Sequence, residues 1–287
     1  MTDRLSDIEA RIGSVQQLQS VIAAMRGIAA ARTMEASRHL RGAQAYEATV
    51  AASIGRAISL LPSGRRPFKK TGKERGRHVL IVLTAEQGFA GSFSERILER
   101  AEVSMGRWPD LTQDVMLIGD RGALLASERS MAVAWSTPMI ATTSEATSLA
   151  NRVMDAFYKR LADGDVRRVS LIHAQPVASQ ALDIVEKRLM PFDFSQFPTR
   201  PKGEPPLVYL QPEVLLERLV NEYIFAEICV AVTLSFAAEN EARMRSMVAA
   251  QEKVGETLQS LQGDARRVRQ EEITNEIGEL STTILAR

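Results

Sequence analysis

Apolar or small residues recur every seven positions through the first sixty residues of the chain. The series is Ile8, Val15, Ile22, Ala29, Ala36, Ala43, Val50 and Ala57, and Leu18 and Met25 form a second line beside it. No proline interrupts this stretch before Pro62. A seven-residue repeat sustained over this length is typical of a helix that packs along a coiled-coil seam. At 1.5 Å per residue, a helix of this extent is roughly 85 Å long.

The tail of the chain has the same periodicity. No proline follows Pro212, and a seven-residue series is supported by a second line and then continued by an apolar stripe. The series is Met247, Val254, Leu261 and Val268, the second line is Met244, Leu258 and Ala265, and the stripe is Ile273, Ile277, Leu280 and Ile284. This pattern predicts a second helix of up to roughly 110 Å. Since both helices flank the same central region, we expect them to pair antiparallel and to bury their seams against each other.

The central region changes to the pattern of strands alternating with helices. Runs that read as strands lie at 78–83, 115–118, 132–135 and 169–172, and the first is apolar on both faces. Helical patterns lie at 94–105 and 144–162, the second with Ser144 as its expected N-cap. Alternation of this kind predicts an α/β domain with a largely parallel, Rossmann-like sheet. The expected organisation is a coiled-coil helix at 1–61, a linker at 62–76, the α/β domain at 77–206 and a second coiled-coil helix at 207–287.

Composition and charge exclude several classes of protein. The 36 basic and 35 acidic residues leave a net charge of +1, which argues against a nucleic-acid-binding protein. The lone cysteine, Cys229, allows no disulfide within the chain and lies in an apolar stretch, which favours a small buried residue over a nucleophile. The longest apolar run, at 224–238, is interrupted by polar residues and falls short of the ~20 residues of a membrane span. We therefore expect a soluble chain that contacts membranes only through partners.

Candidate chemistry is sparse. The segment Thr84–Ser92 follows the first strand, where a phosphate-binding loop sits in dinucleotide-binding folds. It lacks the third glycine and any Gly-Lys-Ser/Thr, so a tight turn is the favoured interpretation. The three histidines, His39, His78 and His173, fall on different predicted elements without metal-ligand spacing. We expect no catalytic residue, no cofactor site and no metal site in this chain.

Both ends of the chain resemble the gamma subunit of F-type ATP synthases. IEARIGSVQ at 8–16 matches that family's opening I-x-x-R-I-x-S-V-x, and IAAMRGIAAAR at 22–32 resembles its I-T-K-A-M-K-M-V-A-A-S-K. Near the other end, ENEARMRSM at 239–247 resembles S-E-x-x-A-R-M-x-A-M, and RQEEITNEI at 269–277 resembles R-Q-A-x-I-T-x-E-I. TAEQGFAGS at 84–92 stands where the family has S-D-R-G-L-C-G-G. Motifs in this order, on the expected architecture, are highly specific.

The resemblance implies a central rotary shaft. It implies that the terminal helices form a coiled coil inside a ring of three alpha and three beta subunits. The α/β domain is then expected to lie with the epsilon subunit against the ring of membrane c subunits, peripheral to the cytoplasmic face of a bacterial plasma membrane. The resemblance further implies that the shaft couples ion flow to ATP synthesis or hydrolysis, and that ATP, Mg and the catalytic residues belong to the ring.

The resemblance also implies three groups of contact residues. The basic neck of the first helix faces beta, a segment of the last helix contacts a beta loop, and the apolar tip is held in the upper bearing of the ring. By position, the neck residues are Met25, Arg26 and Arg32, the loop contacts are Arg269, Gln270 and Thr274, and the tip residues are Ile277, Leu280 and Ile284.

Departures from the family pattern indicate a divergent member. Ala23 and Ala24 replace Thr-Lys at the neck, Ala90 replaces a cysteine, and Glu271 and Glu272 bring acidic charge near the expected beta contact. One hypothesis is that the chain belongs to a second, alternative bacterial F-type ATPase. Two rival interpretations remain: a structural coiled-coil adaptor without a rotary role, and a small α/β enzyme with helical extensions.

Overall fold

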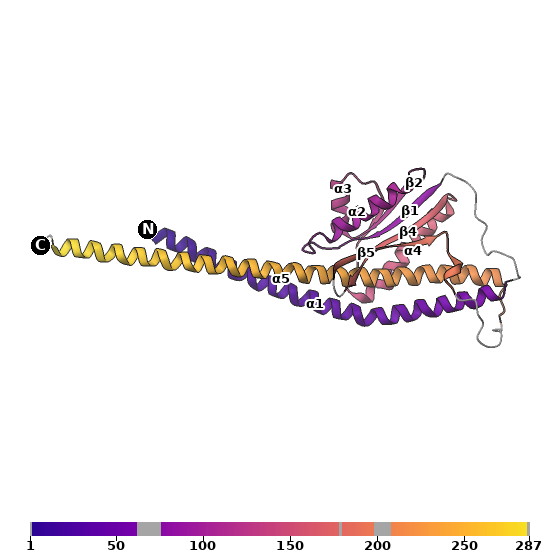
Figure 1. Ribbon diagram of the computed structural model, residues 1–287, viewed down its shortest axis with the longest axis horizontal. Helices are drawn as coiled ribbons and strands as arrows, with labels where there is room; N and C mark the ends of the chain where they lie inside the picture. Colours follow the sequence, from indigo (N-terminus) through magenta and orange to yellow (C-terminus); the bar gives the residue numbers. More distant parts are fainter. Residues whose placement is uncertain (1, 62–75, 178–179, 198–207, 286–287) are drawn as a thin grey trace. The chain divides into compact units, whose positions relative to one another are not determined.

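The structure is a computed structural model that describes residues 2–61, 76–177, 180–197 and 208–285 (Figure 1). It divides into two compact units, one formed by Met1–Ala30 with Arg243–Arg287 and the other by Ala31–Ala242. The elements in chain order are α1 (Thr2–Ser59), β1 (Arg77–Leu83), α2 (Phe93–Gly106), β2 (Thr112–Ile118), α3 (Asp120–Glu128), β3 (Val133–Thr137), the 3-10 turn η1 (Thr143–Glu145), α4 (Ala146–Ala162), β4 (Val166–Val177), β5 (Gln180–Met190), the 3-10 turn η2 (Phe194–Gln196) and α5 (Pro212–Leu285).

The unit Ala31–Ala242 is built on a five-stranded sheet in the order β3-β2-β1-β4-β5. The pairs β1–β2, β1–β4 and β2–β3 are parallel, and β4–β5 is antiparallel. This confirms the prediction of a largely parallel α/β domain inserted between two long helices. The antiparallel strand β5 was not predicted. The expected cap at Ser144 is wrong, because η1 precedes α4 and Glu145 occupies the N-cap position without a side-chain cap.

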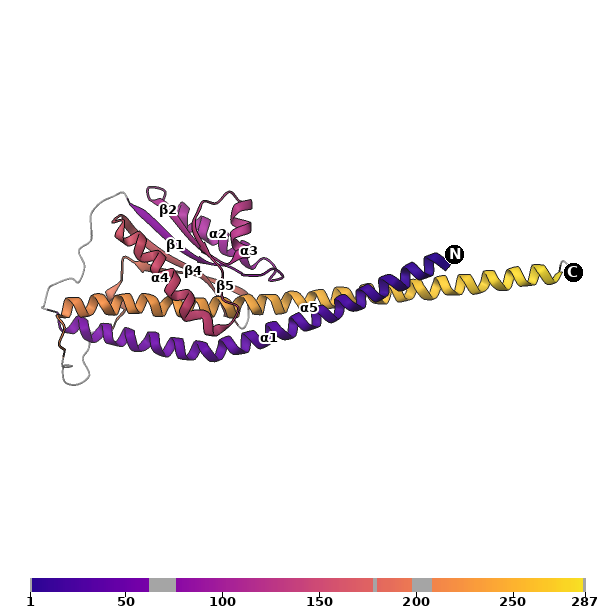
Figure 2. The same cartoon turned by 180° about the vertical axis from the view of Figure 1, so that it is seen from behind.

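Apolar side chains of β1 pack on both faces of the sheet. Val79, Ile81 and Leu83 contribute to a core with α4, the C-terminal part of α1 and the adjoining part of α5. Leu80 and Val82 point to the other face, where α2 and α3 cover them. Figures 1 and 2 show α4 and α5 on one side of the sheet and α2 and α3 on the other. The continuous apolar run at 78–83 therefore has the physical origin expected of it, burial on both faces.

Helix α5 includes a strongly apolar segment. Among the described residues it is the one helix that length and composition would allow to cross a membrane, with an 18-residue window of mean hydropathy 1.5. However, 61% of that window is buried within the protein. Ile224, Ile228 and Val232 belong to the core on the α4 face of the sheet. The hydropathy of α5 is thus explained by core packing, as in the central helix of a globular domain.

The other unit pairs the first part of α1 with the last part of α5. Along α1 from Glu9 to Arg26, the hydrogen-bonded partners on α5 run backward from Arg269 to Gln251, so the two helices are antiparallel. The start of α1 and the end of α5 lie toward the same end of this unit (Figure 1). The seven-residue series predicted the buried seam: Ile22, Ala29, Met247, Leu261 and Val268 are all buried.

Candidate partner-binding surface

Helix α1 carries a second apolar stripe that the paired helix does not cover. Leu18, Val21 and Ile28 are 49%, 54% and 55% exposed, and the half-buried Met25 lies between them in the same 3-4-3 spacing. Leu18 was expected to support the coiled-coil seam, and the structure corrects this, because the seam turns Ile22 and Ala29 inward and leaves Leu18 outside. We call Leu18, Val21, Met25 and Ile28 the outer stripe.

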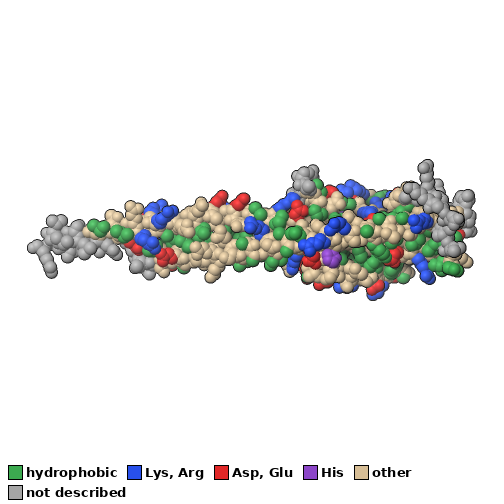
Figure 3. Space-filling view, turned by 90° about the horizontal axis from the view of Figure 1, so that it is seen from below, with side chains coloured by type: hydrophobic (Ala, Val, Ile, Leu, Met, Phe, Trp, Pro, Cys, Tyr) green, Lys and Arg blue, Asp and Glu red, His purple; other side chains and the backbone are tan. Residues whose placement is uncertain are grey.

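The outer stripe is unusual because large apolar residues at regular helical spacing normally mark a covered face. Figure 3 shows apolar side chains lying among charged ones on the surface of the long helices. Fully burying an exposed side chain of this kind contributes about 1.5–3 kcal/mol, and covering the half-exposed residues of the stripe would contribute roughly half of that for each one. The stripe therefore has the character of an interaction surface.

Two of the predicted contact residues, Arg26 and Arg269, lie on exposed parts of the same unit. Arg26 donates from Nη1 to Gln251 Oε1 at 2.8 Å, and Arg269 donates from Nη2 to Glu9 Oε1 at 2.8 Å. Such exposed pairs contribute at most about 1 kcal/mol to stability. Both arginines can therefore exchange their partners for those of another protein at little cost to the fold.

The remaining predicted residues divide by position. Gln270 and Thr274 are exposed one turn apart, and the Thr274 hydroxyl donates to the Gln270 carbonyl at 2.8 Å. Ile277 is 62% exposed, so its apolar side chain is free to contact a partner. Arg32 is half-buried and belongs to the unit Ala31–Ala242. The side chains of Leu280 and Ile284 lie outside the described residues, although α5 continues to Leu285.

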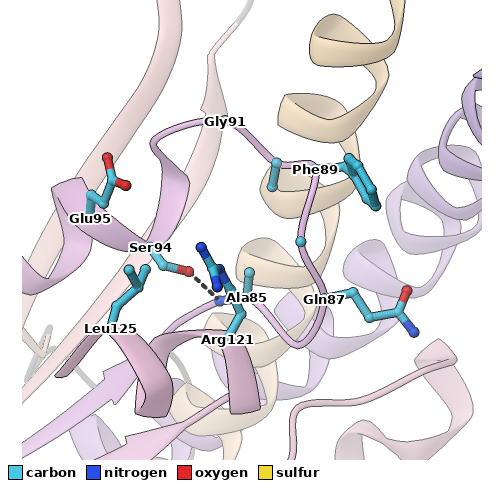
Figure 4. Close-up of a pocket in the computed structure, with 10 residues that line it drawn as sticks. Ala85, Gln87, Phe89, Gly91, Ser94, Glu95, Arg121 and Leu125 are labelled. Atoms are coloured by element: carbon cyan, nitrogen blue, oxygen red, sulfur yellow. Dashed lines mark hydrogen bonds between the residues drawn. The ribbon is translucent and has the colours of Figure 1, made fainter. Parts of the chain in front are cut away.

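The loop after β1 encloses a cavity of about 340 Å³ (Figure 4). Ser94 Oγ accepts a hydrogen bond from the Ala85 amide at 3.1 Å, and Arg121 from α3 lies beside it. Phe89 is at the rim, 67% exposed, with φ of 64°. A positive φ is costly for a bulky residue, and such strain is concentrated at functional positions. The loop therefore presents an exposed aromatic side chain at its surface, and it does not have the form of a Gly-rich phosphate-binding loop.

The carboxylate of Glu86, in the turn after β1, links this turn to the start of α3 and to the segment around Met139. Glu86 Oε2 accepts from the Met139 amide at 2.7 Å and from the Asp120 amide, at the start of α3, at 3.3 Å. The Glu86 amide in turn donates to Glu239 Oε2 at 3.4 Å. An anion at a helix N-terminus is favourable, and here Glu86 supplies it. The geometry therefore supports the interpretation of 84–92 as a structural turn.

The titratable groups of the interior are poorly suited to catalysis. Burial raises the pKa of the Cys229 thiol to about 11, with the charge of Glu222 adding to the effect, so the reactive thiolate is scarce at neutral pH. Burial likewise lowers the pKa of His173. Within the described residues, no group of three or more His, Cys, Asp and Glu side chains could hold a metal ion.

His78 is buried and takes part in a hydrogen-bond network with Gln113 and Ser170. Gln113 donates through its amide nitrogen to the carbonyls of Trp108 and Leu111, so its oxygen is oriented to accept from His78 Nδ1 at 3.1 Å. His78 Nε2 then accepts from the Ser170 hydroxyl at 3.0 Å. Burial, together with the nearby positive charge of Arg168, lowers the pKa of His78 from its usual 6.5 to about 4. The ring is thus part of the fold and unprotonated at neutral pH.

We predict that His78 makes the α/β unit sensitive to acid. The unfolded chain binds a proton on His78 below about pH 6.5, whereas the folded chain resists it down to about pH 4. The stability that His78 contributes is therefore complete above pH 6.5 and is lost as the pH falls to 4. Thermal melts between pH 7.5 and 4.5 should show that His78→Gln, although less stable at neutral pH, loses less stability on acidification than the parent. His39→Gln, the same change at an exposed histidine, is the matched control. An unchanged pH profile in His78→Gln would contradict the assignment.

Comparison with known proteins places this arrangement in a family. Residues 4–286 match a family model described as ATP synthase. The chain belongs to the ATP synthase family. This confirms the resemblance found in the terminal motifs.

Relatives within the ATP synthase family align with this chain over nearly its full length. The ATP synthase gamma chain of Streptomyces avermitilis is 28% identical over 283 residues, covering 94% of this chain and 92% of that protein. The gamma chain of Frankia casuarinae is 25% identical over 288 residues, covering 98% and 96%. The similarity thus includes both terminal helices and the α/β domain between them.

Solved structures of ATP synthases have the same fold. A chain in the OSCP/F1/c-ring of the Euglena gracilis mitochondrial ATP synthase, in rotational state 3, superposes with a TM-score of 0.66 and 11% identity, covering 100% of this chain and 95% of that chain. A chain of the rotor from the same organism, in rotational state 1, gives a TM-score of 0.63 at 10% identity, with 95% and 100% coverage. At such low identity these likenesses establish the architecture alone.

Sequence reasoning missed two features of this family member. The sequence pattern placed Leu18 and Met25 beside the seam and left Val21 and Ile28 unassigned. The 3-4-3 spacing of these four residues nevertheless indicates one face of a helix. The bridging role of Glu86 was missed because it depends on amides from two other loops, which no local pattern reveals.

Proposed function

We propose that this chain is the central rotary shaft of an F-type ATP synthase, in the role that gamma chains hold in this family. The proposal is supported by full-length similarity to gamma chains and by the antiparallel pairing of α1 and α5. The observation that carries most weight is the outer stripe. A coiled coil that already has a buried seam and also presents exposed apolar residues is suited to being enclosed by other subunits.

In this role the partners are those that the resemblance implies. Three alpha and three beta subunits surround the terminal helices, and the epsilon subunit and the c ring contact the α/β domain. The complex is peripheral on the cytoplasmic face of the bacterial inner membrane. The chain itself is non-catalytic, which fits the use of the Glu86 carboxylate to accept backbone amides within the fold, and the protonated thiol of Cys229.

The mechanism we infer is conformational coupling through an asymmetric shaft. A two-helix coil has no threefold symmetry, so each of three surrounding beta subunits meets a different face at any moment. The outer stripe occupies one such face, and rotation presents it to each beta subunit in turn. Because the beta conformations differ in their contacts with that face, turning the shaft changes their relative free energies. Apolar contacts suit this movement since they lack the directionality of hydrogen bonds.

The test is co-expression with the alpha and beta subunits of the same gene cluster, followed by native mass spectrometry. We expect a complex of three alpha, three beta and one copy of this chain. A standard gamma chain expressed with its own ring serves as the positive control. If that control assembles and this chain does not, the alternative of a structural coiled-coil adaptor is favoured, and self-association of the isolated chain would support it.

The hypothesis of an alternative ATPase is tested separately by gene content. A genome with a second F-type operon, this chain belonging to the more divergent one, is the expected finding. A genome in which this chain belongs to the sole F-type operon would exclude it without affecting the shaft role.

A further inference from the structure

A group of arginines surrounds one carboxylate where α2 packs against β5. The Glu186 carboxylate, with a side chain only 7% exposed, accepts from the Ser104 hydroxyl at 2.8 Å. It also pairs with Arg100 Nη2 at 3.2 Å and Arg107 Nη1 at 3.3 Å. Glu186 is therefore held by two guanidinium groups and a hydroxyl, which is a complete set of partners for one carboxylate.

Two further arginines adjoin this set. Arg168 from β4 lies over the ring of Trp108 at 4.5 Å, and the charges of Arg107 and Arg188 act on it together with that of Glu186. Arg188 pairs with Asp193 at 3.4 Å, and both of these side chains are about half exposed. We call Arg100, Arg107, Arg168 and Arg188 the arginine cluster.

The arginine cluster has more positive charge than its surroundings neutralise. The ion pairs of the described residues give it Glu186 and Asp193, two carboxylates for four guanidinium groups. Among the described residues, the buried Nε atoms of Arg100 and Arg168 have no hydrogen-bond partner. Burial lowers the pKa of Arg168, which means that its charged form is under-compensated. An anion brought to the cluster would relieve this cost.

The cluster is also accessible. The side chains of Arg100, Arg107 and Arg188 are 35%, 52% and 45% exposed, so their guanidinium groups can reach a molecule at the surface. The Trp108 ring, itself 39% exposed, provides a flat apolar surface beside them. Arginine with an aromatic side chain is the composition that dominates binding energy at protein interfaces.

We propose that the arginine cluster is a docking surface for an acidic segment of another protein, whose Asp or Glu carboxylates pair with Arg107, Arg168 and Arg188. Glu186 shows that the spacing of these groups accommodates single carboxylates. A polyphosphate or a lipid surface is disfavoured, because its dense charge would be forced against Glu186 and against the negative end of the α2 dipole at Gly106. This inference concerns the α/β unit and does not depend on the rotary role.

The test measures binding of fluorescein-labelled hexaglutamate to the full chain by fluorescence anisotropy. We expect binding that weakens as salt is raised, and about tenfold weaker binding in Arg168→Gln/Arg188→Gln, since two charge-assisted hydrogen bonds are removed. Arg107→Gln/Arg188→Gln provides a second variant, which leaves Arg168 stacked on Trp108 and leaves Arg100 and Ser104 as partners of Glu186. The control is Arg56→Gln/Arg218→Gln, which removes the same charge from exposed positions on α1 and α5.

Each outcome decides the proposal. Weaker binding in both cluster variants, with parental binding in the control, supports a carboxylate-specific surface. If peptide binding weakens equally in the cluster variants and in the control, the effect is one of net charge alone, and the proposal is overturned. Absence of peptide binding, or cluster-dependent binding of phosphatidylglycerol vesicles or inorganic polyphosphate in place of the peptide, would overturn the assignment to an acidic protein segment. None of these results bears on capture by the alpha and beta subunits, so the two proposals fail separately.

Discussion

Replacing Gly122 with alanine is expected to destabilise the α/β unit by about 3 kcal/mol. A Cβ atom at this position of α3 would lie 1.9 Å from Thr84 Oγ1 and 2.4 Å from Thr84 Cβ. Thr84 cannot move away, because it is fully buried at the end of β1 and its hydroxyl donates to the Ile118 carbonyl at 2.6 Å. The clash involves the stem of a short side chain, so the helix itself must shift.

The measurement is urea denaturation of the full chain, followed by circular dichroism. Gly106→Ala is the matched control, because an added Cβ there meets nothing within 4 Å. We expect that control to stay within about 0.5 kcal/mol of the parent. A Gly122→Ala variant as stable as the parent would show that α3 is not tightly packed against β1, and would also weaken the placement of the Asp120 amide beside Glu86.

The elements that could be predicted are those whose hydrophobic pattern is explained by a single kind of burial. The run at 78–83 is apolar at every position because β1 is central in the sheet and covered on both faces. Strand β5 was not predicted because it lies at the edge of the sheet and its sequence does not keep a regular alternation of apolar and polar residues. Leu182 and Ile184 face the α2 side, but Glu186 and Lys187 interrupt the alternation to make ion pairs with α2 and α5.

The heptad pattern identified that α1 is a coiled-coil helix but not which residues face its partner. Ile22 and Ala29 belong to the seam and are buried, whereas Leu18 has an equally apolar side chain and is half exposed. A helix enclosed by several proteins carries more than one apolar stripe, and its own sequence does not tell which stripe pairs within the chain. Family resemblance predicted the terminal contact residues, and their role in the complex stays a prediction.

The outer stripe and the seam should therefore respond differently to charge. Changing Leu18 and Ile28 to aspartate is expected to leave the stability of the isolated chain within about 1 kcal/mol, because both positions are about half exposed. The same double variant should bind the ring of alpha and beta subunits roughly a hundredfold more weakly, since enclosure would bury two charges without partners. Ile22 lies on the same helix between Leu18 and Ile28, but it is in the seam and only 6% exposed. Ile22→Asp should therefore unfold the paired helices.

Two measurements separate these effects: thermal melts of the isolated chain, and native mass spectrometry of the chain co-expressed with alpha and beta. A stable chain that fails to enter the complex is the signature of a surface used only in assembly. A double stripe variant that assembles normally would show that this face of α1 meets water inside the ring, and the contact with beta would then rest on Arg26 and the segment Arg269–Thr274. Loss of stability in the stripe variant as large as that in Ile22→Asp would place Leu18 and Ile28 in the fold itself. Because the seam and the stripe lie on the same helix, a difference between the variants in stability and assembly can be attributed to the direction in which each side chain points.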